Sequence, residues 1–419
     1  MEKEKEKNKP SSKKDSSKRN EDSKQLSKKE AAAISKAQAK ELKKKKQEAK
    51  ALKKEKKKNA KQKKNAKGEI IDDDDVDDEE FEKLVAEILA RDVEHNAVTV
   101  EKLTDDPDYR ASFSLCAAGS NPQDGFVIFG GEYFDGATSK CFDHTLRFRL
   151  LQPTTREWKK ISSQNSPPPR CAHAACTTPT HVYIFGGEFS TAWRFHHYND
   201  LWRLDLKTNQ WQNMPSIGGP SPRSGCRMVS WKNFLVVFGG FYEASRGVRW
   251  FDDLYFYDLK TEKWSKPKFA SSVVQHPSAR SGFQFCCHPT KPMIYLYGGY
   301  SKVAASSSAQ RGRALDDMWV LHLSLPSQKQ SVPEVKWEFI SKRGQTPPKR
   351  SGASSCVHKT RILLFGGVSD TVTENDVIGD FSNSLYAFDM DRHRRHHLSF
   401  HLCPLLLTLP TSAISIYLR

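Results

Sequence analysis

The chain has 419 residues and a formal net charge of +17, from 67 Lys or Arg and 50 Asp or Glu. Residues 1–67 hold 27 of the basic and 10 of the acidic residues, so the rest of the chain is electrically balanced. This distribution argues against a nucleic-acid-binding fold for the whole chain and confines polyanion affinity to the N-terminal segment.

The 9 cysteines are scattered, with no C-x-x-C pair and no Cys/His cluster at zinc-ligand spacing. The N-terminus is charged from its second residue and has no apolar core segment, so it does not resemble a secretory signal. These features favour an intracellular protein, in the cytoplasm, the nucleus or both. Its cysteines are expected to serve as small buried apolar residues.

Residues 1–67 are rich in Lys, Glu, Ser and Gln and contain almost no aromatic or β-branched residues. Such a segment cannot bury enough apolar surface to offset its ordering entropy, so we expect a disordered basic tail. Two interpretations of its Lys runs stay open. The tail either makes only weak, salt-sensitive contact with polyanions such as RNA, or it directs the protein to the nucleus or nucleolus.

Residues 68–104 combine an acidic run with a short amphipathic helix. Its apolar side chains recur at helical spacing, at Phe81, Leu84, Val85, Ile88 and Leu89. The preceding acidic residues favour the helix N-terminus through the helix dipole. The apolar face either binds a partner or docks on the domain that follows. Docking is favoured because a helix this short needs packing to persist.

From residue 105 onward, the chain repeats a unit of short apolar segments that each end in two glycines. Five such pairs lie 53 to 68 residues apart, and each follows four apolar residues, as expected for a buried strand. The pairs are Gly130-Gly131, Gly186-Gly187, Gly239-Gly240, Gly298-Gly299 and Gly366-Gly367. Paired glycines let the backbone bend and approach a neighbour where a side chain would collide.

Three other features keep phase with the glycines. An Arg followed by small residues precedes each apolar run, and a segment containing Asp or Asn follows each glycine pair. A lone Trp then follows in four units, at Trp158, Trp211, Trp264 and Trp337. A Trp in each unit supplies a large apolar surface between neighbouring repeats, and the phased Arg and Asp residues are expected to link turns of adjacent repeats.

A repeat of about 50 residues with this content resembles the kelch unit, a four-stranded blade of a β-propeller. The resemblance covers residues 105–390 and implies an all-β, kelch-type β-propeller in which the Gly, Arg and Trp framework is architectural. The Lys-rich tail, the acidic helix and the segment Phe129-Gly130-Gly131-Glu132-Tyr133-Phe134 are similar to the kelch domain-containing protein 4 family. That narrower resemblance adds little about activity.

The fifth unit follows the pattern to Asp389 and then departs from it. A Trp is expected near residue 395, but the chain reads Arg392-His393-Arg394-Arg395-His396-His397 and continues into an apolar segment. Because members of the resembled family continue into a further repeat, we expect an incomplete six-bladed ring. Its fifth blade would lack the outer strand, and the ring would be open or strained. Residues 391–419 form an atypical tail, in which two prolines argue against a membrane anchor.

No phosphate-binding loop, nucleophile elbow or obvious metal-ligand set occurs in the repeats, so the sequence predicts no enzyme, cofactor or metal site. The segments between each Gly-Gly strand and the next strand instead gather aromatic residues and arginines, which are typical of interface hot spots. The predicted partner-binding residues are Tyr133, Phe134, Phe189, Trp193, Arg194, Phe195, His197, Tyr242, Arg246, Arg249, Trp250 and Tyr300. For several of them, the alternative to partner binding is that the side chain packs over the end of a blade.

These patterns predict a non-enzymatic scaffold or adaptor that binds other proteins through the loop face of a propeller, with no membrane partner. An RNA- or ribosome-associated nuclear factor, acting through residues 1–67, is the alternative. A third interpretation is a substrate receptor of a ubiquitin ligase, a frequent role among kelch proteins, although no BTB domain is visible.

Overall fold

The computed structural model describes residues 86–87, 90–91, 93–121, 124–136, 138–152, 155–191, 194–244, 247–269, 275–302, 312–326, 332–372 and 377–398. The chain divides into two compact units, residues 1–95 and 96–419. In the first unit the described residues are helical, whereas the basic tail and the predicted apolar helix face lie outside the described residues. No helix within the described ranges is long and apolar enough to cross a membrane.

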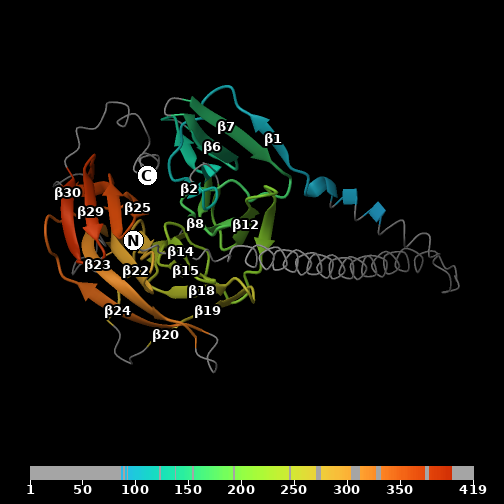
Figure 1. Cartoon of the computed structure of the whole chain (residues 1–419). Helices are drawn as coiled ribbons and strands as arrows, with labels where there is room; N and C mark the ends of the chain where they lie inside the picture. Colours follow the sequence, from blue (N-terminus) through green and yellow to red (C-terminus); the bar gives the residue numbers. More distant parts are fainter. Residues whose placement is uncertain are drawn as a thin grey trace, which may run out of the picture. The chain divides into compact units, whose positions relative to one another are not determined.

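Five sheets, one for each repeat, form the second unit and confirm the predicted β-propeller (Figure 1). Blade 1 has the strand order β2 (Ser114–Ala117), β3 (Phe126–Phe129), β6 (Thr145–Gln152), β7 (Thr155–Ser162) and β1 (Thr99–Lys102). Blade 2 consists of β8 (Ala174–Thr177), β9 (His181–Phe185), β12 (Leu201–Asp205) and β13 (Trp211–Met214). Blade 3 consists of β14 (Arg227–Trp231), β15 (Phe234–Phe238), β18 (Leu254–Asp258) and β19 (Lys263–Ser265).

The last two blades follow the same order. Blade 4 consists of β21 (Gln284–Cys287), β22 (Met293–Lys302), β23 (Gly312–Ser324), β24 (Glu334–Ile340) and a short parallel strand, β20 (Lys268–Phe269). Blade 5 consists of β25 (Ser354–His358), β26 (Arg361–Phe365), β29 (Leu385–Asp389) and β30 (Arg394–Leu398). The first strands β2, β8, β14, β21 and β25 contact one another in this order, so they form the inner wall of the propeller.

The Trp residues pack between blades, as the repeat predicts. Trp211 of blade 2 lies against Phe129 of blade 1, with ring centroids 5.2 Å apart. The next two boundaries repeat the contact, with Trp264 against Phe185 at 5.4 Å and Trp337 against Phe238 at 5.3 Å. Each pair combines the last strand of one blade with the second strand of the blade before it. Burying these rings is a major apolar contribution to holding the blades together.

The phased arginines act differently from the expectation. The fully buried guanidinium of Arg170 binds Asp200 within its own blade, through Nη2–Oδ2 at 2.9 Å and Nη1–Oδ1 at 2.6 Å. The link between blades comes instead from the Arg carbonyl oxygen, which accepts a hydrogen bond from the second glycine of the preceding blade. These bonds join Gly131 to Arg170, Gly187 to Arg223, Gly240 to Arg280 and Gly299 to Arg350, at 2.8 to 3.1 Å.

This series of bonds runs from blade 1 to blade 5. Among the described residues, none joins Gly367 of blade 5 to Arg110 of blade 1. In Figure 1 the red sheet of blade 5 and the blue-green sheet of blade 1 lie at the two ends of an arc. The arrangement agrees with the predicted open ring.

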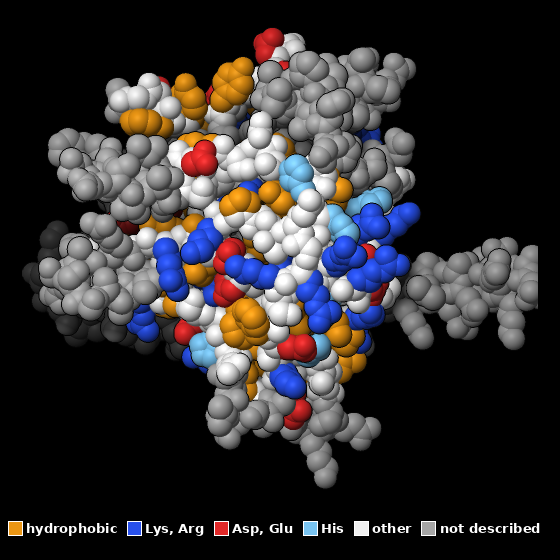
Figure 2. All heavy atoms as spheres, turned by 90° about the vertical axis from the view of Figure 1, so that its left-hand side faces the viewer, with side chains coloured by type: hydrophobic (Ala, Val, Ile, Leu, Met, Phe, Trp, Pro, Cys, Tyr) orange, Lys and Arg blue, Asp and Glu red, His pale blue; other side chains and the backbone are white. Residues whose placement is uncertain are grey.

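The prediction that blade 5 lacks its outer strand is wrong. β30 pairs with β29 over its whole length, from Leu385 opposite Leu398 to Asp389 opposite Arg394. Strand pairing uses backbone groups, so it persists although the expected Trp is missing. The exposed residues of β30 are Arg394, His396 and His397. Figure 2 shows this side of blades 4 and 5, where basic, acidic and His side chains lie close together.

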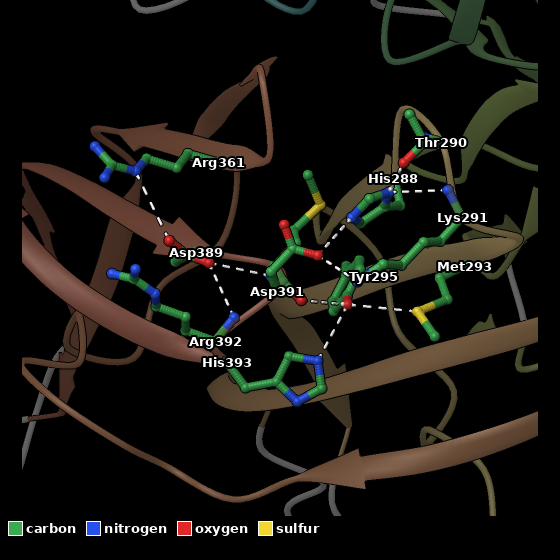
Figure 3. A network of polar contacts seen from close by, with 11 residues as sticks. His288, Thr290, Lys291, Met293, Tyr295, Arg361, Asp389, Asp391, Arg392 and His393 are labelled. Carbon is green, nitrogen blue, oxygen red and sulfur yellow. Dashed lines mark hydrogen bonds and ion pairs between the residues drawn. The ribbon is translucent and has the colours of Figure 1, made fainter.

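A polar network fastens the turn before β30 to blade 4 (Figure 3). The Tyr295 hydroxyl donates to the carbonyl oxygen of Met390 at 2.9 Å and lies 3.1 Å from Nε2 of His393. On the same turn, the Asp391 carboxylate pairs with Lys291 and lies 3.4 Å from Nε2 of His288. These contacts fix the position at which β30 begins, although its sequence departs from the repeat.

Candidate partner-binding face

Those predicted binding residues that the structure describes lie on regular hairpins, whereas loops were expected. In four blades the Gly-Gly pair leads into a separate hairpin, and in blade 4 the ends of β22 and β23 pair in the same place. The hairpins are β4 (Glu132–Phe134) with β5 (Ser139–Cys141), β10 (Glu188–Thr191) with β11 (Arg194–His197), β16 (Phe241–Ala244) with β17 (Gly247–Trp250), and β27 (Val368–Val372) with β28 (Val377–Phe381). Pairing of the two legs satisfies backbone groups that an irregular loop would leave to solvent. We refer to these five hairpins as the hairpin face.

The glycine pairs direct the chain out of each blade and into its hairpin. Gly186 and Gly187 both have positive φ, at 66° and 93°. A Cβ atom on Gly186 would lie 2.6 Å from the carbonyl oxygen of Arg223, and one on Gly187 would lie 2.7 Å from that of Cys171. Only glycine fits both the backbone conformation and this close approach of backbone carbonyls, one from the next blade and one from its own.

A row of aromatic rings crosses the hairpins of blades 2, 3 and 4. The His197 ring lies 5.0 Å from Tyr242 and 5.6 Å from Phe241. Phe241 is 6.2 Å from Trp250, which is 6.5 Å from Tyr300. The structure therefore brings four of the predicted residues together. Phe241 was not predicted, although its place directly after Gly239-Gly240 was a usable signal.

Several aromatic side chains on the hairpin face are open to solvent. Phe134 is 65% exposed and Tyr133 43% exposed in blade 1, and Tyr242 is 38% exposed in blade 3. Phe381, at the end of β28, is 83% exposed and was not predicted. The side chain of Arg249 is exposed, with its guanidinium carbon 5.2 Å from the Phe251 ring. Exposed aromatic residues beside an Arg are typical of protein interfaces.

The remaining predicted residues are half-buried, belong to β11 or lie outside the described residues. Phe189 is half-buried in β10, and Arg194 and Phe195 belong to β11, opposite Thr191 and Ser190. Trp193 and Arg246 lie outside the described residues. Trp250 and Tyr300 are half-buried, and Trp250 Nε1 donates to the Ser281 hydroxyl at 3.3 Å. Packing thus accounts for part of the role of Trp250.

His197 is a neutral, fully bonded residue. Its Nδ1 lies 2.7 Å from the Ser224 hydroxyl, and its Nε2 accepts the Glu243 backbone N–H at 2.9 Å. Because Nε2 accepts, the ring proton lies on Nδ1. Burial lowers the pKa of His197 to about 4. The buried Ser224 and His197 side chains therefore join blade 3 to blade 2 and offer no accessible nucleophile.

Glu188 is a carboxyl group that titrates near neutral pH. Burial raises the pKa of Glu188 to about 7, opposed by a hydrogen bond with Ser224 and assisted by Glu132 and Glu243. Its Oε2 lies 3.6 Å from Nδ1 of His197. The interior of the hairpin face thus changes charge in the physiological pH range.

In the parts of the chain that the structure describes, no group of three His, Cys, Asp or Glu side chains is arranged to hold a metal ion. The adjacent His196 and His197 illustrate why. His196 is exposed and His197 is buried, as expected for neighbours on a strand.

Five four-stranded or five-stranded sheets, joined by phased Gly-Gly, Arg and Trp residues, define a kelch-type β-propeller. The chain belongs to the KLHDC2/KLHL20/DRC7 Kelch-repeats domain family, which matches residues 82–299 and 270–404. The narrower resemblance to kelch domain-containing protein 4 stays a prediction.

Curated relatives share the repeats at low identity. Tip elongation aberrant protein 1 of Schizosaccharomyces pombe is 28% identical over 230 residues, which cover 54% of this chain and 18% of that protein. Kelch domain-containing protein 3 of Rattus norvegicus is 26% identical over 270 residues, covering 63% and 62%. The N-(sulfonatooxy)prop-2-enimidothioate sulfolyase of Thlaspi arvense is 28% identical over 226 residues, covering 52% and 58%. The chain spans less than two thirds of each of these relatives.

Proposed function

We propose that the protein is a non-enzymatic scaffold or adaptor that binds a partner protein through the hairpin face. The observation that carries the proposal is the set of exposed aromatic side chains on the hairpin face, Tyr133, Phe134 and Tyr242, together with the exposed Arg249 opposite Tyr242. Membership of the Kelch-repeats domain family supports the proposal, because propellers of this kind commonly serve as interaction scaffolds.

The hairpin face is well suited to binding a protein surface. Its exposed side chains include Phe134, Tyr242 and Arg249, residue types that dominate the binding energy of protein interfaces. They project from paired strands, and each hairpin starts at a Gly-Gly pair whose second N–H is bonded to the next blade in four cases. A rigid scaffold lowers the entropy cost of binding because few side chains must be ordered.

An enzyme is the main competing class, since one relative is named a sulfolyase. The Ser224–His197 pair on the hairpin face favours a structural role over a catalytic one. Ser224 is 0% exposed and its hydroxyl is engaged with His197. The RNA-associated alternative depends on residues 1–67, which lie outside the described residues. It stays a prediction.

Affinity capture with quantitative mass spectrometry tests the proposal. The full chain is compared with a variant that combines Phe134→Ala, Tyr242→Ala and Arg249→Ala. We expect the recovery of specific protein partners with this variant to fall at least about tenfold, as it does when hot-spot residues are truncated. The control variant combines Phe269→Ala and Phe339→Ala, which remove exposed aromatics from the outer strands β20 and β24.

The outcome distinguishes the classes. Equal partner recovery with all three chains contradicts the proposal, provided that thermal melting shows all three folded. Partners that survive the face variant but disappear on deleting residues 1–67 support the RNA-associated alternative. Partners that survive that deletion and are lost only from the face variant support the scaffold.

A further inference from the structure

The boundaries between blades carry a repeated backbone contact beside the hairpin face. The Arg that opens a blade donates its N–H to a carbonyl just after the returning strand of the preceding hairpin. These bonds are Arg170 to Phe142, Arg223 to Tyr198 and Arg280 to Phe251, each at 3.1 Å. The residue before the acceptor and the residue after the Arg are therefore brought next to each other.

At two of these boundaries, the side chains of the two neighbouring residues contact each other. Between blades 2 and 3 they are His197 and Ser224, whose Nδ1 and hydroxyl oxygen lie 2.7 Å apart. Between blades 3 and 4 they are Trp250 and Ser281, where Nε1 donates to the hydroxyl at 3.3 Å. The position thus places two side chains in direct contact across the boundary.

At the boundary between blades 1 and 2, the equivalent residues are Cys141 and Cys171. Both are thiols, Cys171 buried and Cys141 partly exposed. Their side chains share a hydrogen bond, which together with burial and the nearby Glu132 raises the pKa of Cys171. The neighbouring strands agree, since Cys141 ends β5, β5 contacts β10, and Cys171 pairs with Glu188 at the start of β10.

We propose that Cys141 and Cys171 form a reversible disulfide that locks the blade 1 hairpin to blade 2 under oxidising conditions. Because the Arg170 N–H is bonded to the Phe142 carbonyl, Cys141 and Cys171 each lie one residue from a backbone contact between the blades, which is the close approach that a disulfide requires. The bond would close a loop through the whole outer half of blade 1. It would hold the base of the hairpin that carries Tyr133 and Phe134.

A low-molecular-weight disulfide such as glutathione disulfide supplies the oxidant. Cys141, the more accessible thiol, loses its proton and attacks one sulfur, forming a mixed disulfide and releasing one glutathione thiolate. Deprotonated Cys171 then attacks Sγ of Cys141, forming the protein disulfide and releasing the second glutathione thiolate. The two released thiolates take up the two protons, so two protein thiols are oxidised as one glutathione disulfide is reduced.

The neighbouring cysteines Cys116 and Cys176 are shielded from this reaction. Cys116 and Cys176 lie on the neighbouring inner strands β2 and β8, and both are buried. A bulky oxidant that reaches Cys141 therefore does not reach this pair in the folded protein.

The experiment treats the folded full chain with glutathione disulfide at pH 8, alkylates the remaining thiols after denaturation, and maps the peptides by mass spectrometry. We expect a peptide pair linked through Cys141 and Cys171 that dithiothreitol removes, with Cys116 and Cys176 alkylated. Cross-linking should be at least about tenfold faster at pH 8.5 than at pH 7, because both attacking groups must be thiolates.

Variants complete the test. Cys171→Ser should leave Cys141 as a stable glutathione adduct, while the control Cys356→Ser should leave the cross-link intact. Accumulation of the Cys141 adduct in the unaltered chain, without closure onto Cys171, overturns the proposal. So does preferential linkage of either residue to another cysteine. The mapping of the unaltered chain needs no variant, so a variant that misfolds does not affect it.

Discussion

Arg395 lies opposite Phe388 in the last blade, in the register where Trp264 lies opposite Tyr257 in the third. Its guanidinium carbon is 5.8 Å from the Tyr297 ring and 5.6 Å from the Phe388 ring. Arg395 is 3% exposed, and neither terminal nitrogen has a hydrogen-bond partner among the described residues. A cavity of about 30 Å³, which Arg395 helps to line, remains beside it. A buried charge thus takes the place of a packed indole.

Replacing Arg395 by Trp should stabilise the protein. The change removes a buried charge whose terminal nitrogens lack hydrogen bonds and supplies the ring that packs between blades elsewhere, so we expect a gain of about 1–3 kcal/mol in the free energy of unfolding. Chemical denaturation measures it. The control is Arg394→Trp on the exposed side of β30, which should change stability by less than about 0.5 kcal/mol. A clear loss of stability in Arg395→Trp would show that the site is fitted to arginine.

Replacing Glu188 by Gln should change how stability depends on pH. The folded-state pKa of Glu188 is about 7, above its ordinary value of 4.5, so the folded protein binds the proton more tightly. Its contribution is therefore fully present below pH 4.5 and is lost as pH rises through 7. We expect Glu188→Gln to be about 3 kcal/mol more stable than the unaltered chain at pH 8 and within about 1 kcal/mol of it at pH 5.

Urea denaturation at pH 5 and pH 8 checks this difference between the two chains. The comparison at low pH is needed because His197 acts in the opposite direction. Its pKa is lowered to about 4, so stability is lost as pH falls from 6.5 towards 4 in both chains. Glu101→Gln on the exposed strand β1 is the control. A gain for Glu188→Gln that is the same at both pH values would rule out titration of Glu188 as its cause.

The sequence was sufficient to predict the propeller because its signals are local and repeated. Gly-Gly pairs, phased arginines and single Trp residues mark each blade, and the structure places Trp211, Trp264 and Trp337 at blade boundaries as expected. The outer strand β30 was missed because it lacks the Trp signal, whereas its pairing rests on backbone bonds. Contacts between turns that are far apart in the sequence, such as the ion pair between Lys291 and Asp391, leave no recognisable pattern in either stretch of sequence.

The candidate site was predictable only as a set of segments. Aromatic and Arg enrichment identified segments that fold into hairpins at one end of the blades, but which side chains become neighbours across blades depends on how the blades pack together. Thus Phe241 completes the row between His197 and Trp250, which no single segment reveals. In the same way, Cys141 and Cys171 are 30 positions apart in the sequence and meet only because two blades pack together.

The blade arginines should differ in their contribution to stability. Arg223 is fully buried, binds the Gly239 carbonyl at 3.0 Å and forms a two-pronged ion pair with Asp253. Arg350 contacts the Gly366 carbonyl at 2.7 Å and the Ser382 hydroxyl at 3.1 Å, both neutral groups. Removing Arg223 leaves a carboxylate without its partner, so Arg223→Ala should cost about 3–5 kcal/mol.

Arg350→Ala is the matched comparison. It removes the same side chain but leaves only neutral acceptors, so we expect a cost of about 1–3 kcal/mol. Thermal and urea unfolding of both variants measure the difference. An equal or larger loss for Arg350→Ala would mean that the ion pair with Asp253 adds little beyond the carbonyl contact.

Hydrogen–deuterium exchange of the complex with the partner recovered by affinity capture tests the central claim most directly. Partner binding should slow exchange in the hairpins β4–β5, β10–β11 and β16–β17 by at least about tenfold, because a bound surface restricts local opening there. The outer strands β19 and β24 should exchange at unchanged rates. Protection confined to the outer strands or to residues 1–67, with the hairpins unaffected, would contradict the proposal that the hairpin face binds the partner.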